Sequence, residues 1–317
     1  MRRWIPIAIP ACVSAIMIGA VGVGELLSGA APTSVDSLSG TVSSDFPVES
    51  VQIPSDAGSS DGDSGVHGWL RRGEHGGGVV LLVHSIRSNR VEMLSRARFL
   101  NARGYGVLLI DLQAHGETPG ERITFGARES ENVEAAVAFL RKNFPSERIA
   151  AIGVSLGAAA IVLAGHPLRL DAVVLESMHP TIKEAVENRL RLHLGEAGRV
   201  LSPLLLWQLT FRLNVPPEAL NPITRIGNLN APLLLISGTD DRHTTVAETG
   251  RLFEAARQPK EMWIVPGGGH FNMHAYAGKE YEGHILDFLE PYMHERGADG
   301  WMDQDATHQR AHSNNGI

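Results

Sequence analysis

A serine between two glycines is the residue best placed for chemistry in this sequence. Residues 153–157 read G-V-S-L-G, with Ser155 at the centre of a G-x-S-x-G pattern. The apolar stretch Arg148–Ile152 precedes the pattern, and mostly small or apolar residues fill positions 158–164. This context predicts a sharp turn from a strand into a helix, with the Ser155 hydroxyl presented as a nucleophile at the helix N-terminus. The alternative is a tight turn in which the serine only caps the helix.

A serine hydroxyl needs a general base, and the base needs a third group to orient it. We expect His270 to be the base, because it directly follows the glycines of residues 267–269 at the end of a predicted strand. Those glycines would allow a loop to carry the imidazole over Ser155. His274 is the competing histidine.

Three carboxylates compete for the orienting position. Asp240 and Asp241 end the segment I-S-G-T-D-D at residues 236–241, and Glu176 ends a different predicted strand. Whichever of the two aspartates is not used would be solvated or would cap the following helix.

Acyl transfer also needs donors for the negative charge that develops on the carbonyl oxygen. We expect two backbone N–H groups, one from Leu156 and one from Ile86 in the segment His84-Ser85-Ile86-Arg87. His84 would brace this loop. Arg87 is either a contact for a carboxylate-bearing substrate or, as is more common for arginine, a solvated surface residue.

The elements that must position these residues alternate along the chain. Strand patterns occur at Phe46–Ile53, Val66–Arg71, Val79–His84, Tyr105–Asp111, Arg148–Val154, Asp171–Glu176, Ala231–Ser237 and Glu261–Val265. Helical spacing occurs at Val91–Ala102, Ser130–Asn143, Leu156–Ala164, Val246–Ala256 and Tyr281–Met293. This alternation predicts an α/β fold with a mostly parallel sheet and helices on both faces.

Residues 179–228 interrupt the alternation, since they hold helical patterns and no convincing strand. We expect a helical cap, or lid, over the strand ends, where sites in α/β folds lie. Its apolar segment Leu201–Trp207 is either ordinary packing or the lining of a substrate pocket.

The N-terminus predicts a membrane segment. Two arginines precede an apolar run at residues 4–24, which is close to the length needed to cross a bilayer. We expect residues 1–30 to anchor the chain with its catalytic domain outside the cytoplasm; the alternative is a signal peptide that is removed, giving a secreted or periplasmic protein. A linker at residues 31–45, a main domain at 46–295 and a disordered polar tail at 296–317 would follow.

Composition excludes several classes of function. The chain of 317 residues has a net charge of −7, so it offers nucleic acid no broad positive field. A single cysteine, Cys12, excludes an internal disulfide and a cysteine-based metal site. The histidines show no HExxH spacing, and we predict no metal.

Together these motifs resemble the α/β-hydrolase superfamily, and most closely its bacterial serine aminopeptidase-like and prolyl oligopeptidase-like lineage. The resemblance spans residues 46–293 and rests on His84-Ser85, on D-L-Q-A-H-G at residues 111–116, on the Ser155 motif, on G-T-D-D at 238–241 and on Gly269-His270. It implies a triad in the order serine, acid, histidine, and for the acid it favours Asp241 over Asp240. One departure is Ser85, where the family usually has glycine.

The resemblance implies a serine hydrolase that cleaves a small ester, thioester or amide through an acyl-enzyme intermediate, without a cofactor. The first alternative is a membrane-anchored peptidase that uses the same chemistry. The second is a non-enzymatic binding protein on the same fold, since fold alone does not decide function. The sequence makes no prediction of oligomeric state.

Overall fold

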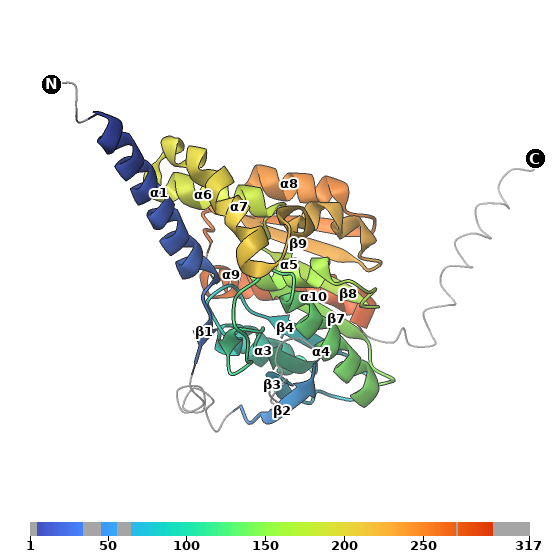
Figure 1. Ribbon diagram of the computed structural model, residues 1–317. Helices are drawn as coiled ribbons and strands as arrows, with labels where there is room; N and C mark the ends of the chain where they lie inside the picture. The colour runs from blue at the N-terminus through green and yellow to red at the C-terminus, as the bar shows by residue number, and fades with distance from the viewer. Residues whose placement is uncertain (1–4, 34–45, 56–64, 271, 294–317) are drawn as a thin grey trace, which may run out of the picture.

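An eight-stranded sheet forms the centre of the molecule in the computed structural model, which describes residues 5–33, 46–55, 65–270 and 272–293, excepting the side chains of residues 5–13, 15 and 16 (Figure 1). Its strands are β2 (Glu49–Pro54), β3 (Gly65–Arg71), β4 (Val79–Val83), β5 (Gly106–Ile110), β7 (Ile149–Val154), β8 (Ala172–Glu176), β9 (Leu233–Gly238) and β10 (Lys260–Val265). Their order is β10-β9-β8-β7-β4-β5-β3-β2. Each of the eight predicted strands is present, with ends shifted by a few residues.

Six neighbouring strands, β10 through β5, run parallel, and β3 runs antiparallel to both β5 and β2. The mostly parallel sheet predicted from the sequence is therefore confirmed. Since the parallel strands all point the same way, their carboxyl ends meet at one edge of the sheet.

Both faces of the sheet are covered, as the alternating side chains of β4 illustrate. Val79, Leu81 and Val83 belong to one buried core, whereas Val80 and Leu82 belong to a second core on the opposite face. Helices α4 (Glu129–Asn143), α5 (Leu156–Leu163) and α8 (Val246–Ala255) contribute to the first core. Helices α3 (Leu94–Asn101), α9 (Met273–Ala277) and α10 (Lys279–Met293) contribute to the second. A continuous apolar run can serve both faces because its side chains alternate between them.

The predicted helical cap lies between β8 and β9. It consists of α6 (Ile182–Leu194), α7 (Ser202–Leu213) and short 3₁₀ turns at 196–201, 217–220, 222–224 and 226–228. Thr181 begins α6 by accepting a hydrogen bond from the backbone N–H of Glu184, and Gly195 ends it with φ 71°. The cap packs onto the first core through Ile182, Leu209 and Leu213.

Helix α1 (Ile5–Ser28) runs beside the cap and contacts α7 (Figure 1). The Gln208 amide donates to the carbonyl of Ala20, and Arg212 and Arg122 pair with Glu25. The chain then forms the short strand β1 (Ala31–Pro32), which pairs with β6 (His115–Gly116). The last turns of α1 are thus attached to the domain that contains the sheet.

The N-terminal membrane segment predicted at residues 4–24 is not supported. Within the described part of the chain, no helix is both long enough and apolar enough to cross a membrane. The location outside the cytoplasm stays a prediction. Most of the predicted linker and the polar tail at 296–317 lie outside the described residues.

Candidate active site

Ser155 lies on the turn between β7 and α5 with φ 49° and ψ −103°, a region of backbone space that side chains seldom adopt. The flanking glycines make this turn possible. A Cβ on Gly157 would lie 2.4 Å from the backbone oxygen of Val83, and one on Gly153 would lie 2.7 Å from the backbone nitrogen of Ala158. The Ser155 side chain makes no capping hydrogen bond to α5, so the alternative of a simple cap does not hold.

The structure brings together three side chains predicted from distant segments. His270 Nε2 lies 3.2 Å from Ser155 Oγ, and His270 Nδ1 lies 2.8 Å from Asp241 Oδ2. An ionised carboxylate can only accept hydrogen bonds, so Nδ1 carries the proton and donates it. Nε2 is then the acceptor that faces the serine hydroxyl. These contacts have the geometry of a nucleophile, a base and an orienting acid.

Asp241 is buried, with 3% of its surface exposed. Its carboxylate also accepts the backbone N–H groups of His243 and Thr244 and the Thr244 hydroxyl, at 2.7–2.9 Å. Burial by itself would raise the pKa of Asp241, but the hydrogen bond and charge of His270 and the Thr244 donors lower it below its usual value. The acid is therefore held ionised and fixed in orientation.

The competing acids have other partners. Asp240 is exposed and, among the residues that the structure describes, accepts a hydrogen bond only from the neighbouring Thr239 hydroxyl, at 3.2 Å. Glu176 is buried at the end of β8 and forms an ion pair with Arg96 of α3 at 2.6 Å, while the Tyr281 hydroxyl donates to its other oxygen. The structure thus places Asp241, and neither alternative, against His270.

His274, the competing base, lies on α9. Its Nδ1 is 3.0 Å from Ser95 Oγ, and its Nε2 is 3.1 Å from Glu282. Both ring nitrogens are therefore engaged away from Ser155. Of the two histidines, His270 is the one that meets the serine.

The loop after β4 holds the predicted oxyanion donor, Ile86. The backbone N–H of Ile86 has no hydrogen-bond partner among the described residues, and Ile86 and Ser155 line the same pocket. Leu156 is the first residue of α5, and its N–H has no partner within the helix. Both groups are thus available to a ligand. Ser85 stands where the family usually has glycine. Its hydroxyl and its backbone N–H both donate hydrogen bonds to the carboxylate of Glu92.

Two buried histidines fix this loop. His84 Nε2 accepts the N–H of Leu112, so its Nδ1 donates to the carbonyl of Ser85 at 2.7 Å. His115 Nε2 accepts the N–H of Arg87 at 2.9 Å. Burial lowers the pKa of His115 to about 3, with a smaller contribution from His84, so His115 stays neutral and keeps accepting this bond. The bracing role predicted for His84 is present, and His115, which belongs to the motif at residues 111–116, is a second brace whose role the sequence did not predict.

Comparisons with known proteins identify the family of this chain. The sequence model of the alpha/beta hydrolase family matches residues 66–282. This chain belongs to that family. Rv2307c of Mycobacterium tuberculosis (strain H37Rv), named an uncharacterized protein, is 29% identical over 226 residues, which are 70% of this chain and 74% of the relative. YqkD of Bacillus subtilis (strain 168), also named uncharacterized, is 24% identical over 216 residues, 67% of this chain and 71% of the relative.

Among solved structures, the Pyrococcus furiosus esterase Pf2001 aligns with a TM-score of 0.64 and 23% identity, covering 78% of this chain and 92% of that one. At such an identity the likeness shows the fold. The α/β-hydrolase fold and the superfamily inferred from the motifs are confirmed, and family membership supports the prediction that the chain is a hydrolase enzyme.

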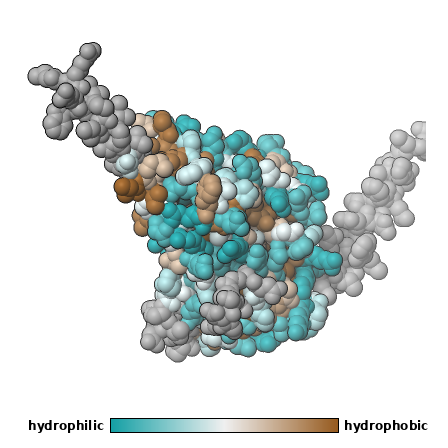
Figure 2. All heavy atoms as spheres, viewed as in Figure 1, coloured by the Kyte–Doolittle hydropathy of each residue, from teal (hydrophilic) through white to brown (hydrophobic). Residues whose placement is uncertain are grey.

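The hydrolase has a pocket of about 440 Å³ over Ser155. Its walls come from the end of α1, the loops after β4 and β6, and the cap. The apolar lining residues are Val23, Leu26, Leu27, Ile86, Phe125, Leu156, Ile182, Ala185, Val186, Leu190, Leu194, Leu205 and Leu209. Leu205 bears out the lining hypothesis for the cap segment, whereas Trp207 points to solvent with 56% of its surface exposed. Figure 2 shows apolar side chains gathered where α1 meets the cap.

Several residues of the site carried no recognisable signal in the sequence. Arg189, His179 and His193 of the cap line the pocket, as do Val23, Gly24, Leu26 and Leu27 of α1. Arg87, considered as a substrate contact or a solvated residue, instead donates to the carbonyls of Leu26 and Gly29. These positions depend on how the cap and α1 pack, which local patterns do not reveal.

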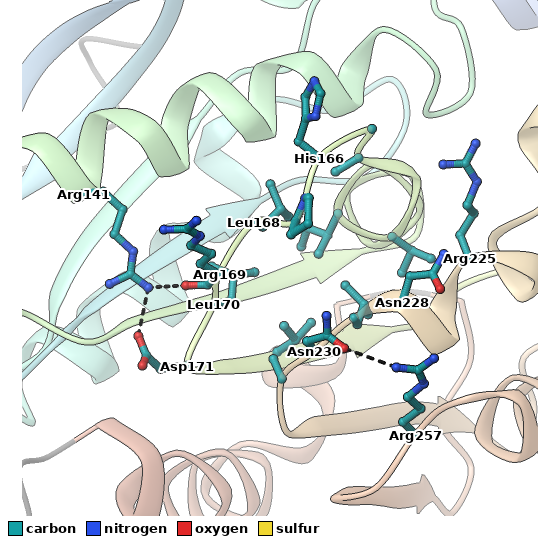
Figure 3. Close-up of a pocket in the computed structure, with 18 residues that line it drawn as sticks. Arg141, His166, Leu168, Arg169, Leu170, Asp171, Arg225, Asn228, Asn230 and Arg257 are labelled. Carbon is teal, nitrogen blue, oxygen red and sulfur yellow. Dashed lines mark hydrogen bonds and ion pairs between the residues drawn. The ribbon is translucent and has the colours of Figure 1, made fainter.

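A larger hollow, of about 1020 Å³, lies elsewhere on the hydrolase (Figure 3). Asp171, which precedes β8, and Ala231, which precedes β9, line it together with Arg141, Arg225 and other residues. It is therefore at the amino ends of the strands, opposite Ser155. Arg141 is already paired with Asp171 there. Since ligand sites in this class of fold lie at the carboxyl ends, we assign the active site to the smaller pocket.

Proposed function

We propose that this hydrolase cleaves carboxylic esters or thioesters through an acyl-enzyme intermediate on Ser155. The observation that carries the proposal is the continuous hydrogen-bonded series from Asp241 through His270 to Ser155. A non-catalytic scaffold has no need for three such residues in this order. The strained serine backbone and the two available N–H groups beside it support the same conclusion.

The mechanism follows from the roles of these groups. Ser155 attacks the substrate carbonyl while His270 Nε2 takes the hydroxyl proton, and Asp241 stabilises the imidazolium that forms. The N–H groups of Leu156 and Ile86 stabilise the oxyanion. His270 then gives its proton to the leaving group. In the second step it activates a water molecule, which releases the acid and regenerates Ser155.

The pocket indicates the kind of substrate. Most of its lining is apolar, and exposed apolar side chains such as Phe211 lie on the neighbouring surface of α7. An apolar acyl chain fits such walls better than a polar peptide does. We therefore favour an esterase or thioesterase over the peptidase alternative.

The test compares the full-length protein with its Ser155→Ala variant, using p-nitrophenyl butyrate and a fluorophosphonate probe. We expect the wild type to hydrolyse the ester and to be labelled, and the variant to do neither. Equal labelling of both proteins would contradict the assignment of Ser155. Aminoacyl and dipeptide p-nitroanilides assayed in parallel would reveal a peptidase, and complete inertness of a folded wild type would favour a binding protein.

A further inference from the structure

We propose that Arg189 gives the acyl pocket a subsite for an anionic group, so that the enzyme prefers esters whose acyl chain carries a carboxylate. The proposal rests on the function proposed above and narrows its substrate class. It concerns a residue of helix α6 that lines the same pocket as Ser155.

The charge of Arg189 is unusual in its surroundings. None of the residues that line the pocket is acidic, and the other charged or titratable side chains there are the histidines His179 and His193. Arg189 has no hydrogen bond or ion pair with any residue in the described part of the chain. Other arginines of the cap are paired: Arg191 donates to Asn188, and Arg199 pairs with Glu187. Arg189 is thus a cation in the lining of a largely apolar pocket, without a hydrogen-bond or ion-pair partner in that part of the chain.

Asp241, the carboxylate whose charge acts on Arg189, already has other hydrogen-bond partners. Burial lowers the pKa of Arg189, and the negative charge of Asp241 offsets part of this effect. Asp241, however, already accepts hydrogen bonds from His270, Thr244 and the backbone of His243. Arginine stays protonated even when it is largely removed from water. An unpaired charge in such a place is costly, and an incoming carboxylate would relieve that cost while forming two parallel hydrogen bonds.

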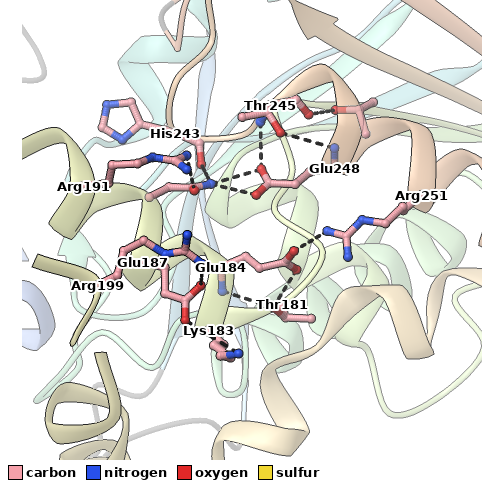
Figure 4. Close-up of polar contacts among 12 residues, drawn as sticks. Thr181, Lys183, Glu184, Glu187, Arg191, Arg199, His243, Thr245, Glu248 and Arg251 are labelled. Atoms are coloured by element: carbon pink, nitrogen blue, oxygen red, sulfur yellow. Dashed lines mark hydrogen bonds and ion pairs between the residues drawn. The ribbon is translucent and has the colours of Figure 1, made fainter. Parts of the chain in front are cut away.

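The backbone that carries Arg189 is held in place. The amide of the preceding residue, Asn188, donates to the carbonyl of His243 and to Glu248 at the start of α8, and Glu184 pairs with Arg251 of α8 (Figure 4). Helix α6 is therefore fastened to the loop that contains Asp241. A rigid support of this kind fixes the distance between a binding group and the reacting serine.

A second polar group faces the same space. His179 lines the pocket with 8% of its surface exposed, and its Nε2 has no hydrogen-bond partner among the described residues. Burial, together with the nearby charges of Arg189 and His270, lowers the pKa of His179 to about 3, so the ring is neutral near pH 7. It can add a neutral hydrogen bond to the ligand that Arg189 binds. Arg189 alone then supplies the permanent charge.

The experiment uses matched esters and the full-length enzyme. Mono-p-nitrophenyl esters of succinic, glutaric, adipic and pimelic acid carry a carboxylate at increasing distance, and each is compared with the uncharged p-nitrophenyl ester of the same chain length. The measured quantity is the ratio of kcat/KM for the charged ester to that for the neutral ester, corrected for spontaneous hydrolysis. We expect this ratio to exceed one and to peak at one chain length.

Arg189→Gln should lower the peak ratio roughly 10- to 100-fold, the range expected when a hydrogen bond to a charged group is lost. The neutral ester of the same chain length is the reference in each protein, so any effect of the substitution that is common to both esters cancels in the ratio. Arg189→Lys should keep part of the preference, because the charge persists without the planar fork. Arg199→Gln is the matched control: it removes an arginine of the cap that does not line the pocket, and it should leave the ratio unchanged.

The outcomes separate this inference from the proposed function. A wild type that hydrolyses neutral esters but shows no preference for any charged ester would overturn the role of Arg189, and so would an unchanged ratio in Arg189→Gln. If Arg189 acted only on the triad, the variant would slow both esters equally and shift the pH profile of the neutral one. If Arg189→Gln fails to fold, the test is competitive inhibition of the wild type. Free adipate should inhibit it more strongly than adipamide, the neutral control, and equal inhibition by the two would contradict the proposal. A wild type inert toward every ester would instead contradict the proposed function.

Discussion

The guanidinium of Arg87 donates a hydrogen bond of 2.7 Å to the backbone carbonyl of Leu26, and so joins the loop after β4 to the end of helix α1. The same loop contains Ile86, which lines the pocket with Ser155 and is the proposed oxyanion donor. The N-terminal helix is therefore attached to the catalytic machinery, and it contributes Leu26 and Leu27 to the pocket. This attachment makes the length of the pocket depend on residues outside the sheet.

Enlarging a residue of α1 should therefore change the preference for chain length. Leu27 is half-buried in the pocket wall, and Leu27→Trp would fill part of the space available to the acyl chain. We expect kcat/KM for p-nitrophenyl octanoate to fall roughly tenfold or more, since overpacking costs about 1–3 kcal/mol, while hydrolysis of the acetate changes little. Val21→Trp is the control, because Val21 is exposed and does not line the pocket. Equal losses on both esters would show that α1 does not limit chain length.

Asparagine substitutions should distinguish the catalytic roles of the two neighbouring aspartates, Asp241 and Asp240. Asp241→Asn would remove the negative charge that stabilises the imidazolium of His270 and would favour the wrong tautomer. In a serine protease triad the equivalent change lowers kcat about 10⁴-fold, and we expect a loss of roughly 10³- to 10⁴-fold here. Asp240→Asn should retain activity within about threefold, since Asp240 is exposed and touches no reacting group. Steady-state kinetics on p-nitrophenyl butyrate measures both; comparable losses would contradict the assignment of Asp241.

The sequence predicted the sheet and the triad for the same physical reason. Strands buried on both faces have continuous apolar runs, and the ends of parallel strands meet at one edge. Ser155, the pair Asp240 and Asp241, and His270 each follow such a run, so the order of elements predicts that they meet. The choice of Asp241 over Asp240 came from the resemblance to α/β-hydrolases. Glu176 also ends a strand, and only the tertiary structure reveals that Arg96 of α3 pairs with it.

The parts that the sequence did not predict depend on packing between separate elements. An apolar run at residues 4–24 has the composition of a membrane segment, and nothing local indicates that Gln208 and Arg212 of α7 contact its carbonyls. Arg189 likewise has no motif, because its position follows from how α6 docks on α8. Such contacts depend on how α1 and the cap helices dock on their neighbours. The spacing of apolar residues along the sequence does not reveal that docking.

The ion pair of Glu176 and Arg96 should contribute to stability and not to catalysis. Both side chains are buried, so Arg96→Met would leave the carboxylate of Glu176 without its countercharge. We expect the free energy of unfolding to fall by about 3–5 kcal/mol, measured by urea denaturation. The double variant Arg96→Met/Glu176→Gln should recover part of that loss, because it no longer buries an unpaired charge.

Kinetic measurements on Glu176→Gln distinguish a structural role of Glu176 from that of a triad acid. With active sites counted by fluorophosphonate labelling, Glu176→Gln should keep kcat per labelled site within about threefold of the wild type, because Glu176 touches no reacting group. A loss as large as that of Asp241→Asn would place Glu176 in the catalytic mechanism.

Acid should destabilise the enzyme through its buried neutral histidines, and His115 gives the sharpest case. Its pKa is lowered by burial from 6.5 to about 3 in the folded state. Above pH 6.5 both folded and unfolded states hold a neutral ring, so the stability is present in full. As pH falls below 6.5 the unfolded chain binds a proton that the folded chain does not, and stability declines by up to about 1.4 kcal/mol per pH unit until the folded pKa is reached.

A variant that cannot titrate isolates this effect. His115→Gln keeps an acceptor for the Arg87 N–H but binds no proton in this range. Its free energy of unfolding should therefore fall about 1 kcal/mol less than that of the wild type between about pH 6 and pH 5, measured by urea denaturation, whereas the exposed His166→Gln should follow the wild type. Identical pH slopes for His115→Gln and the wild type would mean that His115 takes up its proton as readily in the folded enzyme as in the unfolded chain, which would contradict its role as a neutral acceptor for the Arg87 N–H.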